Sequence, residues 1–187
     1  MKGVLFKYDA NPHSPELRDN RRGCGLPDPD FWSNEIPVWA ICGPYVRQGL
    51  EPGDIVFFLP YPRRVRQVDR GLPDFVCTGV LVVGDFIDDA AGVRSDRRLS
   101  RDYRRKYFSD LRGHLRDDRE RAPRTESVRG KKIVLGDRRR SKWLCGDGTA
   151  LQDLTALGMS SLDLGKRRVP YMRNEAAVER LYRELIT

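Results

Sequence analysis

The sequence predicts an α+β fold, in which a mostly antiparallel twisted sheet or a partly open β-barrel is flanked by helices. Several short runs rich in β-branched and aromatic residues are bounded by glycine and proline, which is typical of strands. Apolar residues recur at helical spacing near residues 99–115 and again from residue 174, which is typical of amphipathic helices. A chain of 187 residues can bury a core without disulfide or metal support, so we expect a single domain over residues 1–187.

The N-terminal part alternates extended runs with irregular chain. Residues 3–8 predict a short apolar strand. Residues 9–34 contain four prolines and two glycines, so they predict an irregular loop that is longer than a simple connection. Residues 36–41 predict a short extended run. Pro44 suits the first position of a helix, which we expect to end before Pro52.

The middle of the chain contains the two clearest strands, residues 54–60 and 75–84, which we expect to pair with each other. Between them, residues 61–70 predict a basic loop or an edge strand. A further strand is expected at residues 131–135. Thr149 begins the pattern Thr-x-x-Gln, which predicts a helix cap ahead of a short helix.

Two amphipathic helices complete the predicted fold. The first has an arginine-rich outer face, and its apolar positions are Leu99, Tyr103, Tyr107 or Phe108, Leu111 and Leu115. The second begins near Asn174 and packs through one apolar face, made of Val178, Leu181, Tyr182 and Leu185. We expect this C-terminal helix to close the domain.

Positive charge is concentrated in one part of the chain. Lys and Arg number 35 against 27 Asp and Glu, which gives a net charge of +8. Residues 94–142 hold 19 basic and 8 acidic residues, a net charge of +11 that leaves −3 for the rest of the chain. This pattern predicts a basic helical insertion or extension at about residues 94–142 that attracts polyanions through counterion release. The alternative is a solvated, salt-bridged helix face, because acidic residues are interleaved with the arginines.

The composition excludes a membrane protein. Charged residues make up 33% of the chain and the mean hydropathy is −0.61. No apolar run approaches the ~18 residues that a membrane-spanning helix needs. The first residues have neither the apolar region nor the cleavage site of a signal peptide, so we expect a cytoplasmic protein.

The cysteines give no sign of a metal site. Cys24, Cys42, Cys77 and Cys145 form no CxxC pattern, and no histidine stands at ligand spacing from them. We expect reduced, buried or half-buried thiols, and neither a metal nor a cofactor.

The sequence contains none of the common catalytic motifs. It has no P-loop, no GxGxxG after a strand, no GxSxG elbow and no HExxH. His13, with Asp9, Asp19 or Asp28 nearby in the chain, could act as a general base. The turn around His13 favours a loop-stabilising role instead, and His114 stands among arginines that suit phosphate contacts. A small enzyme that acts on nucleotides or modified bases through His13 and nearby acids is therefore the alternative function.

Aromatic residues occur in and beside the first loop and helix, namely Tyr8, Phe31, Trp32, Trp39 and Tyr45. Aromatic faces bind a planar base by stacking, and Asp9, Asn11 or Asn34 could contact the edge of such a base. The alternative is that Trp39, Trp32 or both belong to the hydrophobic core.

Three runs of residues follow one another in an order found in one superfamily. The first is Val4-Leu5-Phe6-Lys7, followed by Pro12 and Ser14. The second begins at Val38-Trp39 and leads through Leu50 and Pro52-Gly53-Asp54 into an apolar strand. The third is Thr78-Gly79, which opens the next apolar strand. In this order the runs resemble the PUA-like superfamily, especially EVE and ASCH domains, whose relatives include the YTH readers of methylated adenine.

The resemblance covers roughly the first half of the chain and implies a PUA-like fold that holds a base. This sequence has two extra residues before Pro12, and it has Trp39-Ala40 where EVE domains have an arginine-asparagine pair near the helix start. The identity of the base is therefore left open. The long insertion at residues 9–34 and the basic second half are similar to the nucleotide modification associated domains of bacterial and phage systems, which are predicted to recognise modified bases.

Together these observations predict a non-catalytic module that binds DNA, RNA or a modified nucleotide, recognises a modified or flipped base in an aromatic pocket, and has no membrane partner. The candidates for the base pocket are Lys7, Asp9, Asn11, His13, Ser14, Trp32, Asn34, Trp39 and Tyr45. The candidates for phosphate contacts are Arg63, Arg64, Arg66, Arg97, Arg98, Arg101, Arg104, Arg105, Arg138, Arg139, Arg140 and Lys142. A third possibility is a protein-interaction domain whose basic face meets an acidic partner.

Overall fold

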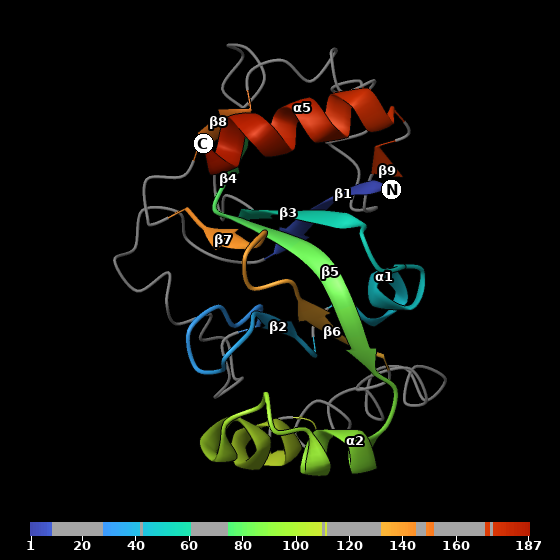
Figure 1. Ribbon diagram of the computed structural model, residues 1–187, viewed down its shortest axis with the longest axis vertical. Coiled ribbons are helices and arrows are strands. Elements are labelled where there is room, and N and C mark those ends of the chain that lie inside the picture. Colours follow the sequence, from blue (N-terminus) through green and yellow to red (C-terminus); the bar gives the residue numbers. More distant parts are fainter. Residues whose placement is uncertain are drawn as a thin grey trace, which may run out of the picture. The chain divides into compact units, whose positions relative to one another are not determined.

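The computed structural model is a mixed α+β protein (Figure 1). It describes residues 1–8, 28–41, 43–60, 75–109, 111, 132–144, 149–151, 171–172 and 174–187. The chain forms two compact units. The described residues of the first unit come from Met1–Leu17, Gly53–Val82 and Ser141–Thr187, and those of the second from Arg18–Pro52 and Val83–Arg140. The predicted single domain, with its basic extension at about residues 94–142, stays a prediction.

The strands pair mostly antiparallel, as the sequence predicts. The larger sheet has seven strands in the order β2 (Val38–Trp39), β6 (Ile133–Gly136), β5 (Gly79–Ile87), β3 (Ile55–Pro60), β1 (Gly3–Tyr8) and β9 (Tyr171–Met172), with β7 (Lys142–Trp143) also paired to β5. A smaller sheet pairs β4 (Phe75–Cys77) with β8 (Thr149–Leu151). Among the described pairs only β1 and β3 run parallel. Over the described residues this sheet does not close into a barrel.

In the first unit, β1 (Gly3–Tyr8) lies between β3 (Ile55–Pro60) and β9 (Tyr171–Met172). The smaller sheet consists of β4 (Phe75–Cys77) and β8 (Thr149–Leu151), and β7 (Lys142–Trp143) pairs with residues 79–80. The predicted pairing of the two clearest strands is confirmed, because β3 pairs with the first half of β5 (Gly79–Ile87). Thr78 interrupts the run predicted at 75–84, and its N–H donates to the carbonyl of Phe58 at 2.9 Å.

The predicted C-terminal helix is confirmed as α5 (Glu175–Ile186). The side chain of Asn174 caps it by accepting a hydrogen bond from the N–H of Ala177 at 3.1 Å. Its apolar face packs into a core with β1, β3 and β5, made of residues that include Leu5, Phe57, Val80, Val178, Leu181 and Leu185. A Cβ at Gly3 would lie 2.5 Å from Cγ2 of Val178, so β1 passes very close to α5.

The second unit contains β2 (Val38–Trp39), β6 (Ile133–Gly136) and residues 83–87 of β5. Its helices are α1 (Pro44–Gln48), α2 (Ala90–Ser95) and a helix over residues 101–109. Pro44 lies in the first turn of α1, as predicted. The helix predicted near 99–115 is confirmed where the structure describes it, and its buried side chains Leu99, Tyr103 and Tyr107 join the core with Val38, Ile87 and Leu135.

Two predictions of secondary structure differ from the structure. The helix cap expected at Thr149 is wrong, because Thr149–Leu151 form β8 and Thr149 pairs with Cys77 of β4. Helix α2 is absent from the sequence prediction, although Asp89 caps it by accepting a hydrogen bond from the N–H of Gly92. The basic segment 61–70 lies outside the described residues. None of the helices described here is long and apolar enough to cross a membrane.

Candidate nucleic-acid interface

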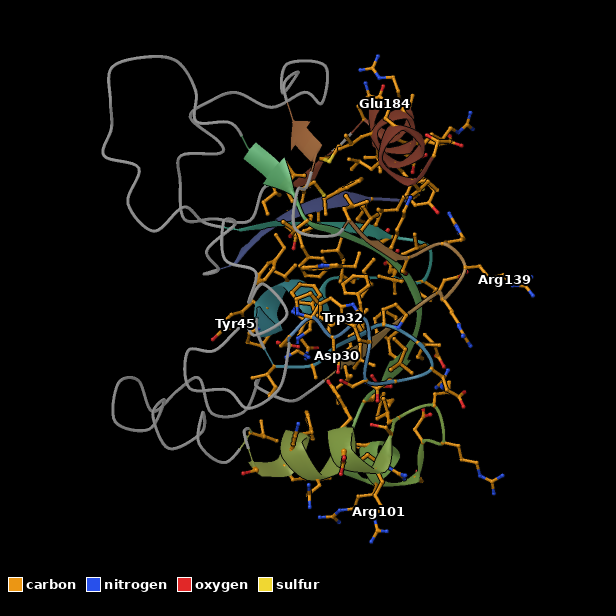
Figure 2. The ribbon with its side chains drawn as sticks, turned by 90° about the vertical axis from the view of Figure 1, so that its left-hand side faces the viewer. Asp30, Trp32, Tyr45, Arg101, Arg139 and Glu184 are labelled. Carbon is orange, nitrogen blue, oxygen red and sulfur yellow. The ribbon has the colours of Figure 1, made fainter. Side chains whose placement is uncertain are left out.

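Trp32 lies on a short, firmly held segment of the second unit. The carboxylate of Asp30 accepts hydrogen bonds from the backbone N–H groups of Trp32 and Ser33, both at 2.9 Å. Asp30 and Val38 also exchange two backbone hydrogen bonds of 2.8 Å, which attach the segment to β2. The side chain of Trp32 nevertheless stays 42% exposed. Figure 2 shows Asp30 and Trp32 close together in the middle of the view. The indole is therefore available to a ligand on a backbone that is already ordered.

Asn34 joins this segment to the start of the helix over residues 101–109. Its Oδ1 accepts a hydrogen bond from the N–H of Ser100 at 2.8 Å, and its Nδ2 donates to Oδ2 of Asp30 at 3.4 Å. Ser100 Oγ in turn accepts from the N–H of Tyr103 at 3.1 Å, which caps the helix. The amide of Asn34, a predicted contact to the base edge, thus makes two structural hydrogen bonds.

The other two aromatic candidates, Trp39 and Tyr45, differ in exposure to solvent. Trp39 is completely buried in β2 and belongs to the core, so neither face of its indole is open to a base. Tyr45 is 63% exposed on α1, and Figure 2 shows it pointing outward. Among the described aromatic candidates of this unit, Trp32 and Tyr45 are thus the ones that a ligand can reach.

The remaining base-pocket candidates are described in part or not at all. Lys7 lies in β1, paired with Leu59 of β3, but its side chain is outside the described part of the structure. Asp9, Asn11, His13 and Ser14 also lie outside the described residues.

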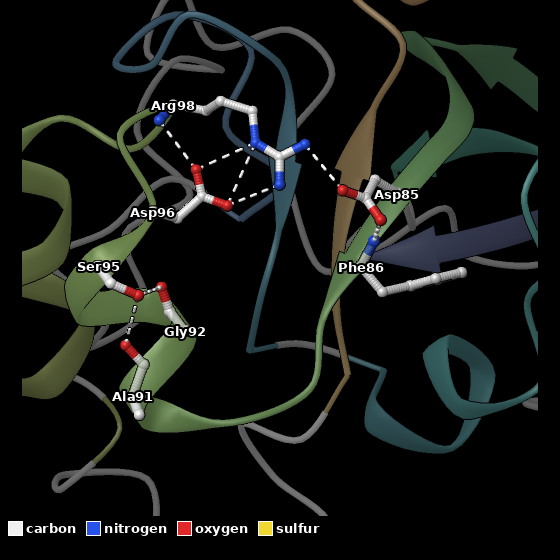
Figure 3. A network of polar contacts seen from close by, with 7 residues as sticks. All are labelled: Asp85, Phe86, Ala91, Gly92, Ser95, Asp96 and Arg98. Carbon is white, nitrogen blue, oxygen red and sulfur yellow. Dashed lines mark hydrogen bonds and ion pairs between the residues drawn. The ribbon is translucent and has the colours of Figure 1, made fainter.

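Arg98, a predicted phosphate contact, is engaged by two carboxylates (Figure 3). Its Nε and Nη2 donate to Asp96 at 3.0 and 2.6 Å, and its Nη1 donates to Asp85 at 2.8 Å. Hydrogen bonding to Arg98 is the main reason why the pKa of Asp96 and the pKa of Asp85 are lowered. Arg98 therefore links the end of β5 to the chain that follows α2, and its fork is occupied by acids rather than open to phosphate.

The other arginines on or near the helix over residues 101–109 differ in the contacts that their side chains make. Arg104 donates to the carbonyl of Arg94 at 2.8 Å, and the Arg94 guanidinium lies 5.0 Å from the ring centroid of Phe108. Arg105 forms an exposed ion pair with Asp102 at 3.4 Å, which contributes little to stability. Arg97 and Arg101 are exposed. The predicted arginine-rich outer face is thus present, with Arg101 and Arg105 one turn apart.

A second exposed basic group follows β6. Arg138, Arg139 and Arg140 are consecutive and exposed. In Figure 2, Arg139 extends to the right and Arg101 downward, so these two side chains point to different sides of the second unit. Lys142 donates to the carbonyl of Ile186 at 3.2 Å and so caps the end of α5. Arg63, Arg64 and Arg66 lie outside the described residues.

Asp28, one acid of the alternative enzyme mechanism, has a structural role. Its carboxylate accepts hydrogen bonds from the buried N–H groups of Ala40 at 2.7 Å and Ile41 at 3.0 Å. Nearby, the buried Arg47 donates to the carbonyls of Ile41 and Lys132. Burial is the main cause of the raised pKa of the Tyr103 hydroxyl, and the charges of Asp28 and Asp30 raise it further.

The anchoring roles of Asp28 and Asp30 are not among the sequence predictions. The signal for Asp30 is the short run Asp-Phe-Trp-Ser-Asn, because an aspartate commonly accepts from backbone N–H groups two and three residues later. For Asp28 no local signal exists, since its partners stand 12 and 13 residues away. Among the described residues, no group of three or more His, Cys, Asp or Glu side chains could hold a metal ion.

Among the described residues of the second unit, the candidate site thus consists of the exposed indole of Trp32, the exposed ring of Tyr45 and two groups of exposed arginines. In comparisons with protein-family models, with curated proteins and with solved structures, this chain matches none.

Proposed function

We propose that this protein is a non-catalytic nucleic-acid-binding module in which Trp32 stacks on a base and exposed arginines contact phosphates. The observation that carries the proposal is the half-exposed indole of Trp32 on a backbone held by Asp30. A residue that is ordered before binding loses less conformational freedom when a ligand arrives. Stacking on such an aromatic contributes about 1–3 kcal/mol per base.

The arginines supply the second half of the proposed activity. Residues 94–142 carry a net charge of +11, and Arg97, Arg101, Arg138 and Arg139 of this segment are exposed. Contacts from such groups to phosphates position a protein on nucleic acid without reading its sequence. Specificity would then come from the surroundings of Trp32, with Tyr45 as a second aromatic side chain of the same unit.

The finer features of the proposal are a PUA-like fold, a modified or flipped base as ligand, and a cytoplasmic location. The motifs behind the resemblance fall on three strands that are neighbours in the sheet, with Val4-Leu5-Phe6 in β1, Gly53-Asp54 directly before β3 and Gly79 at the start of β5. Taking a base out of a duplex costs a few kcal/mol, which stacking on aromatic side chains can offset.

The test is a titration of the protein with labelled oligonucleotides, both single-stranded and duplex with one modified or mismatched base. Trp32 is the exposed tryptophan, whereas Trp39 is buried and Trp143 is partly buried. Stacking should therefore quench mainly the Trp32 fluorescence. Trp32→Ala should weaken binding about 5- to 150-fold, which corresponds to the stacking energy of one base, and leave the thermal midpoint nearly unchanged.

Tyr171→Ala is the matched control, since Tyr171 is 46% exposed in β9 of the first unit. It should bind as the wild type does. Equal affinities of the wild type and Trp32→Ala would contradict the stacking role. Turnover of a nucleotide panel that disappears in His13→Ala would replace the proposal by the enzyme alternative. No binding to any of the oligonucleotides would overturn the proposed function as a whole.

A further inference from the structure

Residues 137–141 connect two strands that pair with β5, and we refer to them as the arginine turn. Both β6 and β7 pair antiparallel with β5, one after the other. Gly136 is paired with Val83, and Lys142 is paired with Val80. Two residues of β5, Leu81 and Val82, therefore face five residues of the partner chain, and the five-residue stretch must project out of the ladder.

The backbone of the arginine turn is held at both ends. Oδ1 of Asp137 accepts hydrogen bonds from the N–H groups of Arg139 at 2.8 Å and of Arg140 at 3.2 Å. At the other end, Oγ of Ser141 accepts from the N–H of Val82 at 3.0 Å and so replaces a ladder partner. The turn is thus a fixed feature whose central residues are Arg138, Arg139 and Arg140.

The arginines of this turn differ from those around the helix over residues 101–109. Arg98 is enclosed by two carboxylates and Arg104 is bonded to a carbonyl. By contrast, the side chains of Arg138 and Arg139 are exposed and make no ion pair within the described part of the chain. Two guanidinium groups are therefore already available to an external anion.

From this placement we propose that the arginine turn enters the minor groove of duplex DNA, with a preference for narrow A·T tracts. Side chains of consecutive turn residues diverge, so they suit a groove with phosphates on both walls better than one row of phosphates. The minor groove is about 6 Å wide, which admits arginine side chains but no helix. Narrow A·T tracts have an enhanced negative potential that attracts arginine.

The presence of arginine rather than lysine in the turn also favours the minor groove of duplex DNA as the partner. All three central residues are arginine, whose guanidinium is more weakly hydrated than the lysine ammonium and loses less solvation on entering a groove. The minor groove of A-form RNA is wide and shallow, so it offers the diverging side chains no pair of close walls. This inference rests on the proposed function and specifies which nucleic acid the basic part contacts.

The experiment measures the affinity of the full chain for four fluorescent probes by anisotropy. The probes are an A·T-tract duplex, a G·C-rich duplex of equal length, a single strand and an RNA duplex. The wild type should prefer the A·T-tract duplex several-fold, and netropsin, which occupies the minor groove of such tracts, should displace it. Arg138→Ala with Arg139→Ala should remove both effects and lower the salt slope by about 0.9 for each lost phosphate contact.

Two further variants distinguish the effect of the arginine side chains and of the turn geometry from the effect of net charge. Arg138→Lys with Arg139→Lys keeps the charge, and it should retain the salt slope but lose most of the A·T-tract preference. Asp137→Ala removes a negative charge, which by electrostatics alone should strengthen binding. Because it also frees the turn, we expect weaker binding to the A·T-tract duplex. Asp102→Ala is the control, since it removes a carboxylate from the same basic segment without touching the turn, and it should strengthen binding slightly.

The outcomes distinguish the two proposals. Binding that netropsin does not affect, a stronger affinity for the single strand or the RNA duplex, or tighter binding by Asp137→Ala would overturn the minor-groove inference and leave the nucleic-acid function in place. Failure to bind any of the four probes would overturn the proposed function itself.

Discussion

Asp28 and Asp30 are two buried carboxylates that backbone N–H groups hold in place. Both are at most 2% exposed, and both accept hydrogen bonds from backbone N–H groups. Hydrogen bonds to a charged acceptor are stronger than those between neutral groups, so such contacts can offset the cost of burial. Within residues 28–41, these two side chains therefore hold backbone that lies outside regular secondary structure.

Asp28→Ala should destabilise the second unit strongly. The change leaves the buried N–H groups of Ala40 and Ile41 without their acceptors, which we expect to lower the free energy of unfolding by about 3 kcal/mol. Urea denaturation followed by circular dichroism measures the effect. Asp88→Ala, at an exposed position, is the control and should change stability little. A loss as small as that of the control would show that Asp28 does not anchor β2.

Cys77 should be inert in the folded protein. Burial raises the pKa of its thiol to about 12, and its Sγ lies 3.4 Å from the carbonyl of Gly79. Because the thiolate is the reactive form, iodoacetamide at pH 8 should modify Cys77 only after unfolding. Mass spectrometry of the peptide that contains Cys77, with and without guanidinium chloride, measures this. Rapid labelling without denaturant would contradict the placement of Cys77 in the core.

At the scale of elements, Arg98 joins β5 to the chain after α2 through Asp85 and Asp96. Asp85 is 59% exposed and Asp96 13% exposed, so solvent screens part of the interaction, and Arg98→Ala should cost about 1 kcal/mol at pH 7. Both carboxyls have a pKa below the usual value when folded. Their contribution is therefore present above the unfolded pKa of about 3.9 and lost as the pH falls below it.

The difference in stability between the wild type and Arg98→Ala should thus be largest near neutral pH and should vanish in strong acid. Urea denaturation at a series of pH values measures it. Arg97→Ala, at the neighbouring exposed position, serves as the control and should show no such dependence. A constant difference at all pH values would mean that Arg98 acts through packing rather than through its carboxylate partners.

Gly3 fixes the distance between β1 and α5. An added Cβ would lie 2.5 Å from Cγ2 of Val178 and 3.0 Å from Sδ of Met172. Gly3→Ala should therefore lower the free energy of unfolding by about 1–3 kcal/mol. Val178→Ala in the same chain should relieve the overlap, so the double variant should lose less than the two single changes together. Additive losses in this double-mutant cycle would contradict the close contact.

The elements that could be predicted from the sequence are those with a strong local pattern. The apolar strands at β1 and β3, and the helix α5 with its cap at Asn174, carry their signals within a few residues. The strand β8 could not be predicted, because its three residues are extended through pairing with β4 and not through their own preference. Helix α2 was missed because its six residues are too few to show a helical period.

At the scale of the whole molecule, the position of the positive charge matters more for the proposed binding than its total. We expect affinity for duplex DNA to fall with salt, with a slope of about 0.9 for each phosphate contact. Arg101→Ala with Arg105→Ala should reduce the slope. Arg180→Ala with Arg183→Ala changes the net charge equally, but these residues lie on α5 of the first unit, and this pair should leave the slope unchanged. Equal effects of the two pairs would show that only net charge matters.

The sequence indicates which aromatic and basic residues are candidates for the site, but it does not indicate which of them are exposed. The sequence places Trp32 and Trp39 seven residues apart, and nothing in their neighbours decides which one faces solvent. The pairing of β2 with β6 buries Trp39, whereas the turn held by Asp30 leaves Trp32 exposed. Of the two carboxylates that bind Arg98, Asp96 stands two residues away in the chain and fits the salt-bridged alternative, whereas Asp85 stands 13 residues away and gives no local signal.

Strand β5 takes part in both units, since residues 79–82 pair with β3 and residues 83–87 pair with β6. Its backbone amides therefore form an internal probe for hydrogen–deuterium exchange. If each unit opens by itself, amides a few positions apart in this one strand will exchange with different opening free energies. If the units open only together, the protection will be uniform along β5, and a single strand will report that the chain unfolds as one cooperative body.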